Sequence, residues 1–272
     1  MLKFSLLLAT VGRTAELERF LSSLDAQTYR NFDLIVVDQN PDERLAALVQ
    51  SYAGRFPVLC VKSAPGLSRA RNAGLRYVSG DVIAFPDDDC WYPPDLLRKA
   101  TLWLESNVEY DGLSVLVRDG SGRPSGHWAA RHGVINRYDV WQKARSMSVL
   151  LRRRVVDAVG AFDESLGAGA GSPWGSGEET DYLIRAMQVG YHFYYEPALS
   201  VCHPEFREVA KAYAYGMGYG RVLRKHAYPA WFVICCWARS LGGALLSLAA
   251  LRFYSASCHW AALKGRMRGW IQ

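Results

Sequence analysis

The sequence has few cysteines, and none of the six lies in a Cys-x-x-Cys pair. Structural zinc sites and disulfide frameworks both depend on closely spaced cysteines, so these scattered thiols favour neither. Reduced thiols are typical of the cytoplasm. We therefore expect a cytoplasmic protein without a structural zinc or a disulfide.

Acidic residues are absent after Glu208, although nine Lys and Arg residues follow it. Because the whole chain carries a net charge of +6, the first 208 residues carry −3. Basic tails commonly contact nucleic acid or anionic membranes. This tail is also rich in apolar residues and contains Trp231, Trp237, Trp260 and Trp270. That composition favours an anionic membrane surface over nucleic acid.

Long apolar runs are also scarce. Met1-Leu2-Lys3 and the apolar run from Phe4 look like a signal peptide. The run is short, however, and a charged helix-like stretch follows it, so we expect it to be the first strand.

Residues 229–254 are the most apolar stretch, and about 20 residues can cross a bilayer. Arg239 argues against a simple spanning helix, and we expect Gly242-Gly243 to divide the stretch into two interfacial pieces. Whether it spans or lies on the membrane stays open.

The rest of the chain alternates between strand and helix patterns. Apolar runs predict strands, and helically spaced apolar stripes between them predict helices. The predicted strands of the first half are residues 4–10, 32–37, 58–61 and 81–85. Short links between them predict right-handed βαβ units in a mostly parallel, doubly wound α/β sheet. We expect this domain to occupy residues 1–208 and a helical, membrane-associating region to occupy residues 209–272.

Three carboxylates, Asp87 to Asp89, follow the fourth predicted strand directly after Pro86. Adjacent carboxylates repel each other unless a cation or hydrogen-bond donors neutralise them. Asp38 ends the second strand, so both groups are expected at the carboxyl edge of the sheet, where open α/β folds bind ligands. Oxygen ligands suit Mg²⁺ or Mn²⁺, usually shared with a phosphate. A solvated acidic turn explains three acids alone, but this convergence favours a ligand site.

A glycine-rich stretch occupies residues 167–177 and contains five glycines and Trp174. A plain linker has this composition too, but next to an acid cluster a lid that closes over substrate is at least as good an interpretation. Glu178, Glu179 and Asp181 head the helix that follows, where the helix dipole favours acids.

Taken together, these residues resemble glycosyltransferase family 2, inverting enzymes with the Rossmann-like GT-A fold, of the type that assembles bacterial polysaccharides. The resemblance covers Phe4 to about His203, and no single motif within it is specific. The motifs in order are Thr10, Asp38, Gly66 with Arg69-x-x-Asn72-x-Gly74, Gly80-Asp81, Asp87-Asp88-Asp89 and Gly177-Glu178-Glu179-x-Asp181.

The resemblance implies contacts to a nucleotide-sugar donor. Asp38 would accept a hydrogen bond from the base, with Thr10 and Arg13 nearby. Arg69 would face the diphosphate. Asp87 or Asp88 would contact the ribose. The remaining candidate substrate contacts are Gly66, Asn72 and Trp174.

The resemblance also implies a cation and a base. Asp89 would hold Mg²⁺ or Mn²⁺, and His203 resembles a further metal ligand, although a structural role explains a lone His before Pro equally well. Relatives usually have Glu-Asp where this chain has Glu178-Glu179. By position Glu179 becomes the general base, with Glu178 as the runner-up and Asp181 as the next candidate.

The implied reaction moves one hexose-type sugar from a nucleotide-diphospho-sugar to a hydroxyl of a glycan or lipid-linked acceptor at the cytoplasmic face of the inner membrane. The Gln-x-x-Arg-Trp signature of processive members is absent, which favours one sugar per acceptor. One alternative is a non-catalytic, membrane-attached glycan-binding module, against which the intact Asp89 and Glu179 argue. The other is a sugar-nucleotide pyrophosphorylase, which would need an early Gly-rich loop with a basic residue. The sequence does not name the sugar, the base or the acceptor.

Overall fold

The computed structural model describes residues 1–204 and 208–272, which pack as two units. The first unit comprises residues 1–65, 69–162 and 182–204, and the second comprises residues 66–68, 163–181 and 208–272. The division expected at residue 208 remains a prediction. Each unit is described by itself.

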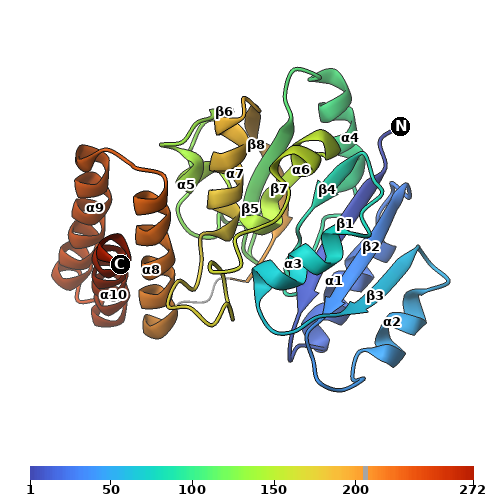
Figure 1. Ribbon diagram of the computed structural model, residues 1–272, viewed down its shortest axis with the longest axis horizontal. Coiled ribbons are helices and arrows are strands. Elements are labelled where there is room, and N and C mark those ends of the chain that lie inside the picture. Colours follow the sequence, from blue (N-terminus) through green and yellow to red (C-terminus); the bar gives the residue numbers. More distant parts are fainter. Residues whose placement is uncertain (205–207) are drawn as a thin grey trace. The chain divides into compact units, whose positions relative to one another are not determined.

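The first unit is built on an eight-stranded sheet with the order β3-β2-β1-β4-β7-β5-β8-β6 (Figure 1). The pairs β1–β2, β2–β3, β1–β4 and β5–β8 are parallel, and the pairs β4–β7, β5–β7 and β6–β8 are antiparallel. The predicted mostly parallel sheet is confirmed, with antiparallel β7 in its middle. The strands are β1 (Phe4–Thr10), β2 (Phe32–Asp38), β3 (Val58–Lys62), β4 (Val82–Ala84), β5 (Gly112–Arg118), β6 (Gly133–Ile135), β7 (Val149–Arg152) and β8 (Phe193–Cys202).

Helices connect these strands and complete the chain. A short 3₁₀ turn, Ser146–Ser148, precedes β7. The polar region of residues 118–138 contributes β6 to the sheet edge. The helices are α1 (Ala15–Asp25), α2 (Ala46–Tyr52), α3 (Leu67–Leu75), α4 (Leu96–Ser106), α5 (Val140–Lys143), α6 (Arg153–Val159), α7 (Glu178–Gln188), α8 (Val209–Lys225), α9 (Ala230–Ala249) and α10 (Phe253–Ile271).

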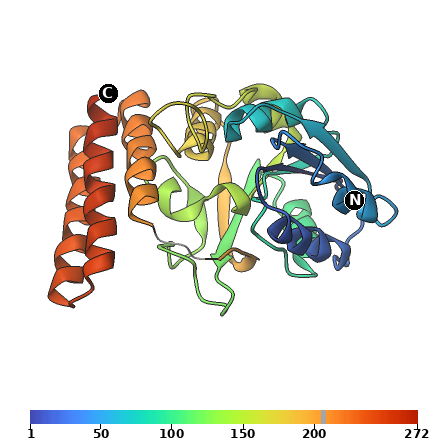
Figure 2. The ribbon, with the colours of Figure 1, turned by 90° about the horizontal axis from the view of Figure 1, so that it is seen from below.

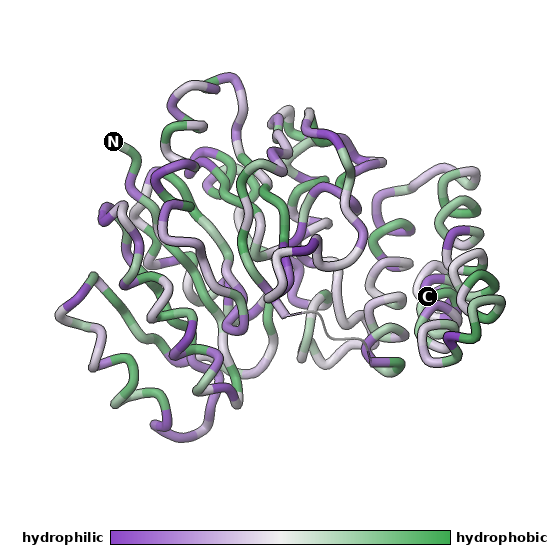
Figure 3. The backbone as a smooth tube through the Cα atoms, turned by 180° about the vertical axis from the view of Figure 1, so that it is seen from behind, coloured by the Kyte–Doolittle hydropathy of each residue, from purple (hydrophilic) through white to green (hydrophobic). Residues whose placement is uncertain are grey.

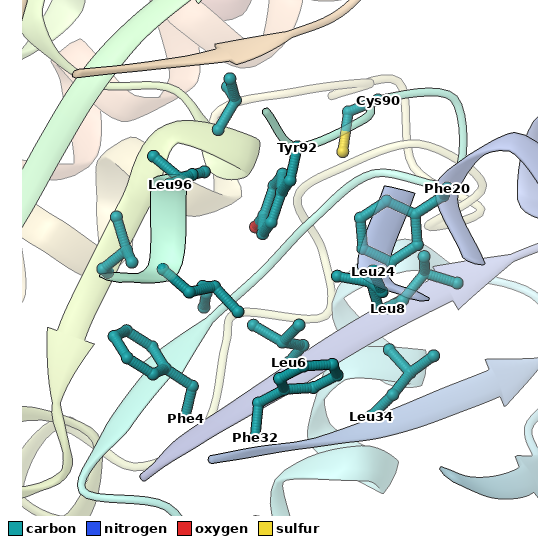
Figure 4. Close-up of a cluster of buried hydrophobic side chains, with 14 of the residues drawn as sticks. Phe4, Leu6, Leu8, Phe20, Leu24, Phe32, Leu34, Cys90, Tyr92 and Leu96 are labelled. Carbon is teal, nitrogen blue, oxygen red and sulfur yellow. The ribbon is translucent and has the colours of Figure 1, made fainter. Parts of the chain in front are cut away.

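The main core lies on one face of the sheet, because successive side chains of a strand point to opposite faces. Phe4, Leu6 and Leu8 of β1 are fully buried and pack with Phe20 of α1 and Leu96 of α4 (Figure 4). The hydropathy colouring of Figure 3 shows that apolar residues concentrate along these strands. Each such side chain stabilises the fold by roughly 1.5–3 kcal/mol relative to its exposed state.

The opposite face of the sheet is covered by α3. Leu7 of β1 points to this face, and a Cβ added at Gly74 would collide with Leu7 and lie 2.8 Å from Val37 Cγ2. Glycine at residue 74 therefore lets α3 lie close against β1 and β2. With helices on both faces, the carboxyl ends of the parallel strands remain the open edge of the sheet.

Strand β8 runs from Phe193 to Cys202 and contains a bulge. Its pairing with β5 shifts register between Val115 and Leu116, whose partners are Glu196 and Ser200. Pro197 therefore sits in a bulge, where its missing N–H removes no ladder hydrogen bond. The continued strand carries the chain to His203.

The second unit contains three long helices that run side by side, α8 with α10 and α10 with α9 (Figure 2). Glycines allow the α8–α10 contact, because a Cβ at Gly220 would collide with the Arg266 carbonyl and one at Gly269 with the Met217 carbonyl. These two helices therefore touch through their backbones.

The expected break at Gly242-Gly243 is wrong, because α9 runs unbroken to Ala249. A Cβ at Gly243 would lie 2.8 Å from the imidazole of His259 on α10, so this glycine provides room for a neighbouring helix. The chain instead turns at Leu251, which has a positive φ of 55°.

Candidate functional site

The acid cluster lies at the carboxyl edge of the sheet, as the sequence predicts. Asp87 forms an isolated parallel bridge with Ala9, so the loop after β4 starts beside the end of β1. Thr10 and Asp38 end the neighbouring strands β1 and β2 and are paired in register. Residues from three parallel strands therefore gather at one edge.

Asp88 is held by two donors from the β1 end. Thr10 Oγ1 donates to Asp88 Oδ2 at 2.7 Å, and Arg13 Nη1 donates to Asp88 Oδ1 at 2.6 Å. Burial raises the pKa of Asp88, and these two hydrogen bonds oppose that rise. Arg13 Nη1 also lies 2.6 Å from Asp89 Oδ2, so one guanidinium bridges two adjacent carboxylates. The resemblance implies that Thr10 and Arg13 lie near the donor's base; in the structure both contact Asp88, and their role toward the donor stays a prediction.

Asp87, Asp89 and His203 offer ligand atoms that all lie within 4.8 Å of one another, the one such group among residues 1–204 and 208–272. His203 Nε2 lies 2.9 Å from Asp89 Oδ1. Burial alone would lower the pKa of His203, but its hydrogen bond with Asp89 raises it. The β8 backbone brings His203 here, because Trp91 and Cys202 form an antiparallel bridge next to it.

This cluster fits a divalent cation. Two carboxylate oxygens and an imidazole nitrogen are a ligand set that Mn²⁺ and related ions accept. Burial raises the pKa of Asp87 and outweighs the opposing effect of the nearby Arg71 and His203, so that the resulting pKa is about 6. A partly buried carboxylate whose charged form is disfavoured gains from a cation placed beside it. The roles of Asp89 and His203 as ligands remain predictions.

Arg71 lies against the acid cluster although the sequence analysis did not single it out, and the predicted contact of Arg69 with the diphosphate stays a prediction. Arg71 is 1% exposed, packs over the rings of Phe85 and Phe162, and places Nη2 3.4 Å from Asp87 Oδ1. Arg69 is exposed. Helical spacing is the feature that distinguishes the two arginines. Residue 71 lies one helical turn before Gly74, which faces the sheet, whereas residue 69 does not.

Asp38 is buried and fixed from both sides. Its Oδ1 accepts from the backbone and side-chain nitrogens of Asn40 at 2.8 and 2.7 Å, and its Oδ2 lies 2.9 Å from Lys62 Nζ. Lys62 ends β3, the third parallel strand of this edge, and was also missed. The carboxylate is therefore held in one orientation by groups from two strand ends.

Two other predicted substrate contacts have structural partners. Asn72 donates from Nδ2 to the Phe162 carbonyl at 3.0 Å and accepts from the Phe162 N–H at 2.8 Å, so its amide ties α3 to the end of the α6 segment. Gly66 belongs to the second unit and has a φ of 128°, a conformation that favours glycine.

The second unit holds the candidate bases at the start of α7. Glu178 is buried, and Glu179 is more open. Asp181 is completely buried, and its Oδ1 lies 2.7 Å from Lys225 Nζ and 2.8 Å from His226 Nε2. A general base must reach the proton of an acceptor. This accessibility favours Glu179 over the other two, although its role remains a prediction.

Trp174 and the glycine-rich stretch lie along α8 within the second unit. The Arg221 guanidinium lies 4.2 Å from the centroid of the Trp174 ring. Ser176 Oγ donates to the Tyr215 carbonyl at 3.0 Å, and a Cβ at Gly218 would collide with the Ser176 backbone. In this structure the predicted lid is fastened to a helix.

Comparison with known families identifies the family to which this chain belongs. The profile of Glycosyl transferase family 2 matches residues 5–154, more than half of the chain and all of the acid-bearing strand ends. The chain belongs to glycosyl transferase family 2.

Curated members of the family align over different lengths. The succinoglycan biosynthesis protein ExoM of Rhizobium meliloti is 27% identical over 266 residues, which is 89% of this chain and 82% of ExoM. WfgD of Escherichia coli, named as a UDP-Glc:alpha-D-GlcNAc-diphosphoundecaprenol beta-1,3-glucosyltransferase, is 34% identical over 92 residues, or 33% of this chain. That alignment spans 36% of WfgD, and a match to an uncharacterised glycosyltransferase of Haemophilus influenzae spans 35% of that protein.

Solved structures show the fold of the family. The mannosyltransferase PcManGT of Pyrobaculum calidifontis, solved with GDP-Man and Mn²⁺, superposes with a TM-score of 0.69 at 16% identity, covering 97% of this chain and 87% of that one. TarS 1-349 of S. aureus superposes with a TM-score of 0.65 at 15% identity, covering 98% and 91%. The GT-A architecture expected from the sequence is thereby confirmed.

Proposed function

We propose that this family 2 protein transfers one hexose-type sugar from a nucleotide-diphospho-sugar to a hydroxyl of a glycan or lipid-linked acceptor, with inversion, during synthesis of a cell-surface polysaccharide. The observation that carries the proposal is the cluster of Asp87, Asp89 and His203 at the carboxyl edge of the parallel strands. Relatives named for succinoglycan synthesis and for transfer to a diphosphoundecaprenol-linked sugar support this class of substrates.

In this proposal the strand ends bind the donor. Asp38, oriented by Asn40 and Lys62, accepts a hydrogen bond from the base. Thr10 and Arg13 hold Asp88 toward the ribose. A Mg²⁺ or Mn²⁺ ion bound by Asp89 and its neighbours would offset the negative charge that develops on the departing diphosphate.

Glu179 acts as the general base. The acceptor hydroxyl becomes a stronger nucleophile as it loses its proton, and a positioned carboxylate takes that proton. Attack on the face opposite the leaving diphosphate inverts the anomeric centre. Among the three acids at the start of α7, Glu179 is the one that burial leaves accessible for this role.

The proposal is tested with a panel of UDP-, GDP- and dTDP-sugars, measured by thermal shift with Mn²⁺ and again with EDTA. We expect one donor to raise the midpoint of unfolding only when Mn²⁺ is present, because ligands that bind the folded state stabilise it. Release of the nucleoside diphosphate on addition of acceptor separates a transferase from a glycan-binding module. A stabilising donor that is never consumed with any polyprenyl-linked acceptor would support the module.

We also propose that the C-terminal helices rest on the cytoplasmic face of the inner membrane. Among the described residues, α9 is the one helix long and apolar enough to cross a bilayer. Its buried side, which includes Val233 and Ala244, faces the protein. Its other side exposes Ile234, Leu241 and Leu245, which are 58%, 40% and 57% exposed. Such a one-sided apolar stripe on a basic segment is typical of helices at a lipid interface.

The membrane proposal predicts a loss of liposome flotation in the double variant Leu241→Glu/Leu245→Glu. Two leucines removed from lipid cost about 3 kcal/mol, or roughly 100-fold in partitioning. The measurement is co-flotation with vesicles containing anionic phosphatidylglycerol. Leu102→Glu, at a residue that is 55% exposed in the first unit, is the matched control and should float like the wild type. Equal flotation of the double variant would mean that this face does not contact lipid.

A further inference from the structure

Lys225, the last residue of α8, joins the two ends of a loop segment, residues 163–181, which comprises the glycine-rich stretch of residues 167–177, its flanks and the first turn of α7. Its Nζ lies 2.6 Å from Asp163 Oδ2 at the start of this loop and 2.7 Å from Asp181 Oδ1 at its end. The Lys225 side chain is 29% exposed, whereas that of Asp181 is completely buried. One ammonium group therefore bridges the two carboxylates at the ends of this segment.

Asp163 is organised to hold this ammonium. Its Oδ1 accepts from the backbone N–H of Ser165 at 2.9 Å and also from the Ser165 hydroxyl. Burial alone would raise the pKa of Asp163, but the hydrogen bonds from Lys225 and Ser165 lower it to about 2. The carboxylate is thus charged and paired throughout the physiological range.

His226 completes the contact with the buried end of the loop. Its Nε2 lies 2.8 Å from Asp181 Oδ1, and the His226 side chain is itself buried. Removing one partner of a buried charged group is costly, because the remaining charge loses its compensation. Asp181 sits in the first turn of α7, two residues after Glu179, so its placement fixes the backbone that carries both glutamates.

The loop is also ordered between its two ends. Gly167 N donates to the Trp174 carbonyl at 3.0 Å, and Leu67 N donates to the Ala168 carbonyl at 2.9 Å. A Cβ at Gly167 would lie 3.2 Å from Glu178 Oε2, so the loop packs directly on the neighbouring glutamate. The position of the loop and the position of the first turn of α7 are therefore linked.

We infer that Lys225 is a positioning residue for the proposed transfer, holding Asp163 and Asp181 together so that the first turn of α7 presents Glu179 to the acceptor. The inference rests on the proposed function and extends it to a residue outside the family match of residues 5–154. Lys225 contacts neither donor nor acceptor in this scheme. Its loss should therefore lower the rate of the chemical step and leave donor binding unchanged.

The test is Lys225→Met, which keeps the length of the side chain and removes its charge. We expect kcat to fall by about 10- to 100-fold, because a misplacement of about 1 Å can cost 10²-fold, while the donor Kd stays within about twofold. Hydrogen exchange should accelerate at the amides of residues 163–181. Lys225→Arg, which keeps a cation, should restore most of the rate. Lys211→Met, on the same helix in a surface pair with Glu208, is the matched control and should change neither quantity.

The inference is overturned if Lys225→Met retains its kcat, or if its donor Kd weakens in step with kcat. Should this variant fail to fold, Asp163→Asn removes one arm of the contact and leaves the pair with Asp181. Unchanged exchange and unchanged kcat in Asp163→Asn would then overturn it equally. If the wild type consumes no nucleotide sugar, the proposed function fails, and the exchange measurement alone decides whether Lys225 orders the loop.

Discussion

Asp89→Ala is expected to remain folded and to lose Mn²⁺-dependent donor binding. Asp89 lies in a loop after β4, where its carboxylate contacts Arg13 and His203 and supports no strand or helix. Arg13 keeps its bond to Asp88 in the variant. Metal affinity depends on the number of ligands, so removing one of three should weaken binding below detection at micromolar donor. Calorimetric titration of the donor with and without Mn²⁺ measures the effect.

The control for this variant is Asp95→Ala, which removes an equal charge from the far end of the same loop, next to α4. Asp95 pairs with Lys99 on the surface of α4 and lies outside the group of Asp87, Asp89 and His203. It should bind Mn²⁺ and donor as the wild type does. Retention of metal-dependent donor binding in Asp89→Ala would assign the cation to other residues.

Glu179→Gln is expected to lose transfer while it binds donor normally. The amide keeps the shape of the side chain and removes the proton acceptor, and a general base contributes about 10²–10⁴-fold in rate. Donor affinity should change little, because the base serves the acceptor. Initial rates of transfer and the donor Kd, measured on the same preparation, separate these two effects.

Glu178→Gln is the companion variant, because Glu178 is adjacent but buried. If Glu178→Gln abolishes transfer and Glu179→Gln retains it, the assignment is off by one residue. If both remain active, the base lies outside this pair. Asp181 would be a poor substitute, since it is fully buried between Lys225 and His226.

The parallel half of the sheet and its acidic edge could be predicted from local sequence. The run Phe4–Thr10 is continuous and buried on both faces, so it could be identified as a central strand without knowledge of its neighbours. Once strands alternate with helices, the carboxyl ends share one edge. Asp38 and the Asp87–Asp89 run were therefore placed together correctly.

The other half of the site depends on contacts that local patterns do not record. Strand β7 inserts between β4 and β5 through pairings that join distant parts of the chain. His203 reaches Asp89 because β8 continues past a proline bulge. Arg71 can be recognised only when Gly74, one helical turn later, is known to lie against the sheet, which is a tertiary contact. Each case is a tertiary choice that outweighs local propensity.

Helices α8 and α10 touch at several points through glycine backbones, which have no side chain that could change rotamer and absorb a displacement. Because the two helices are closely packed, a tilt of α10 would therefore move α8 as well. The last residue of α8 is Lys225, which contacts Asp163 and Asp181 at the two ends of the loop segment. Under the proposed membrane contact and transfer reaction, lipid packing and curvature are therefore expected to change the turnover rate, as substrate concentration does.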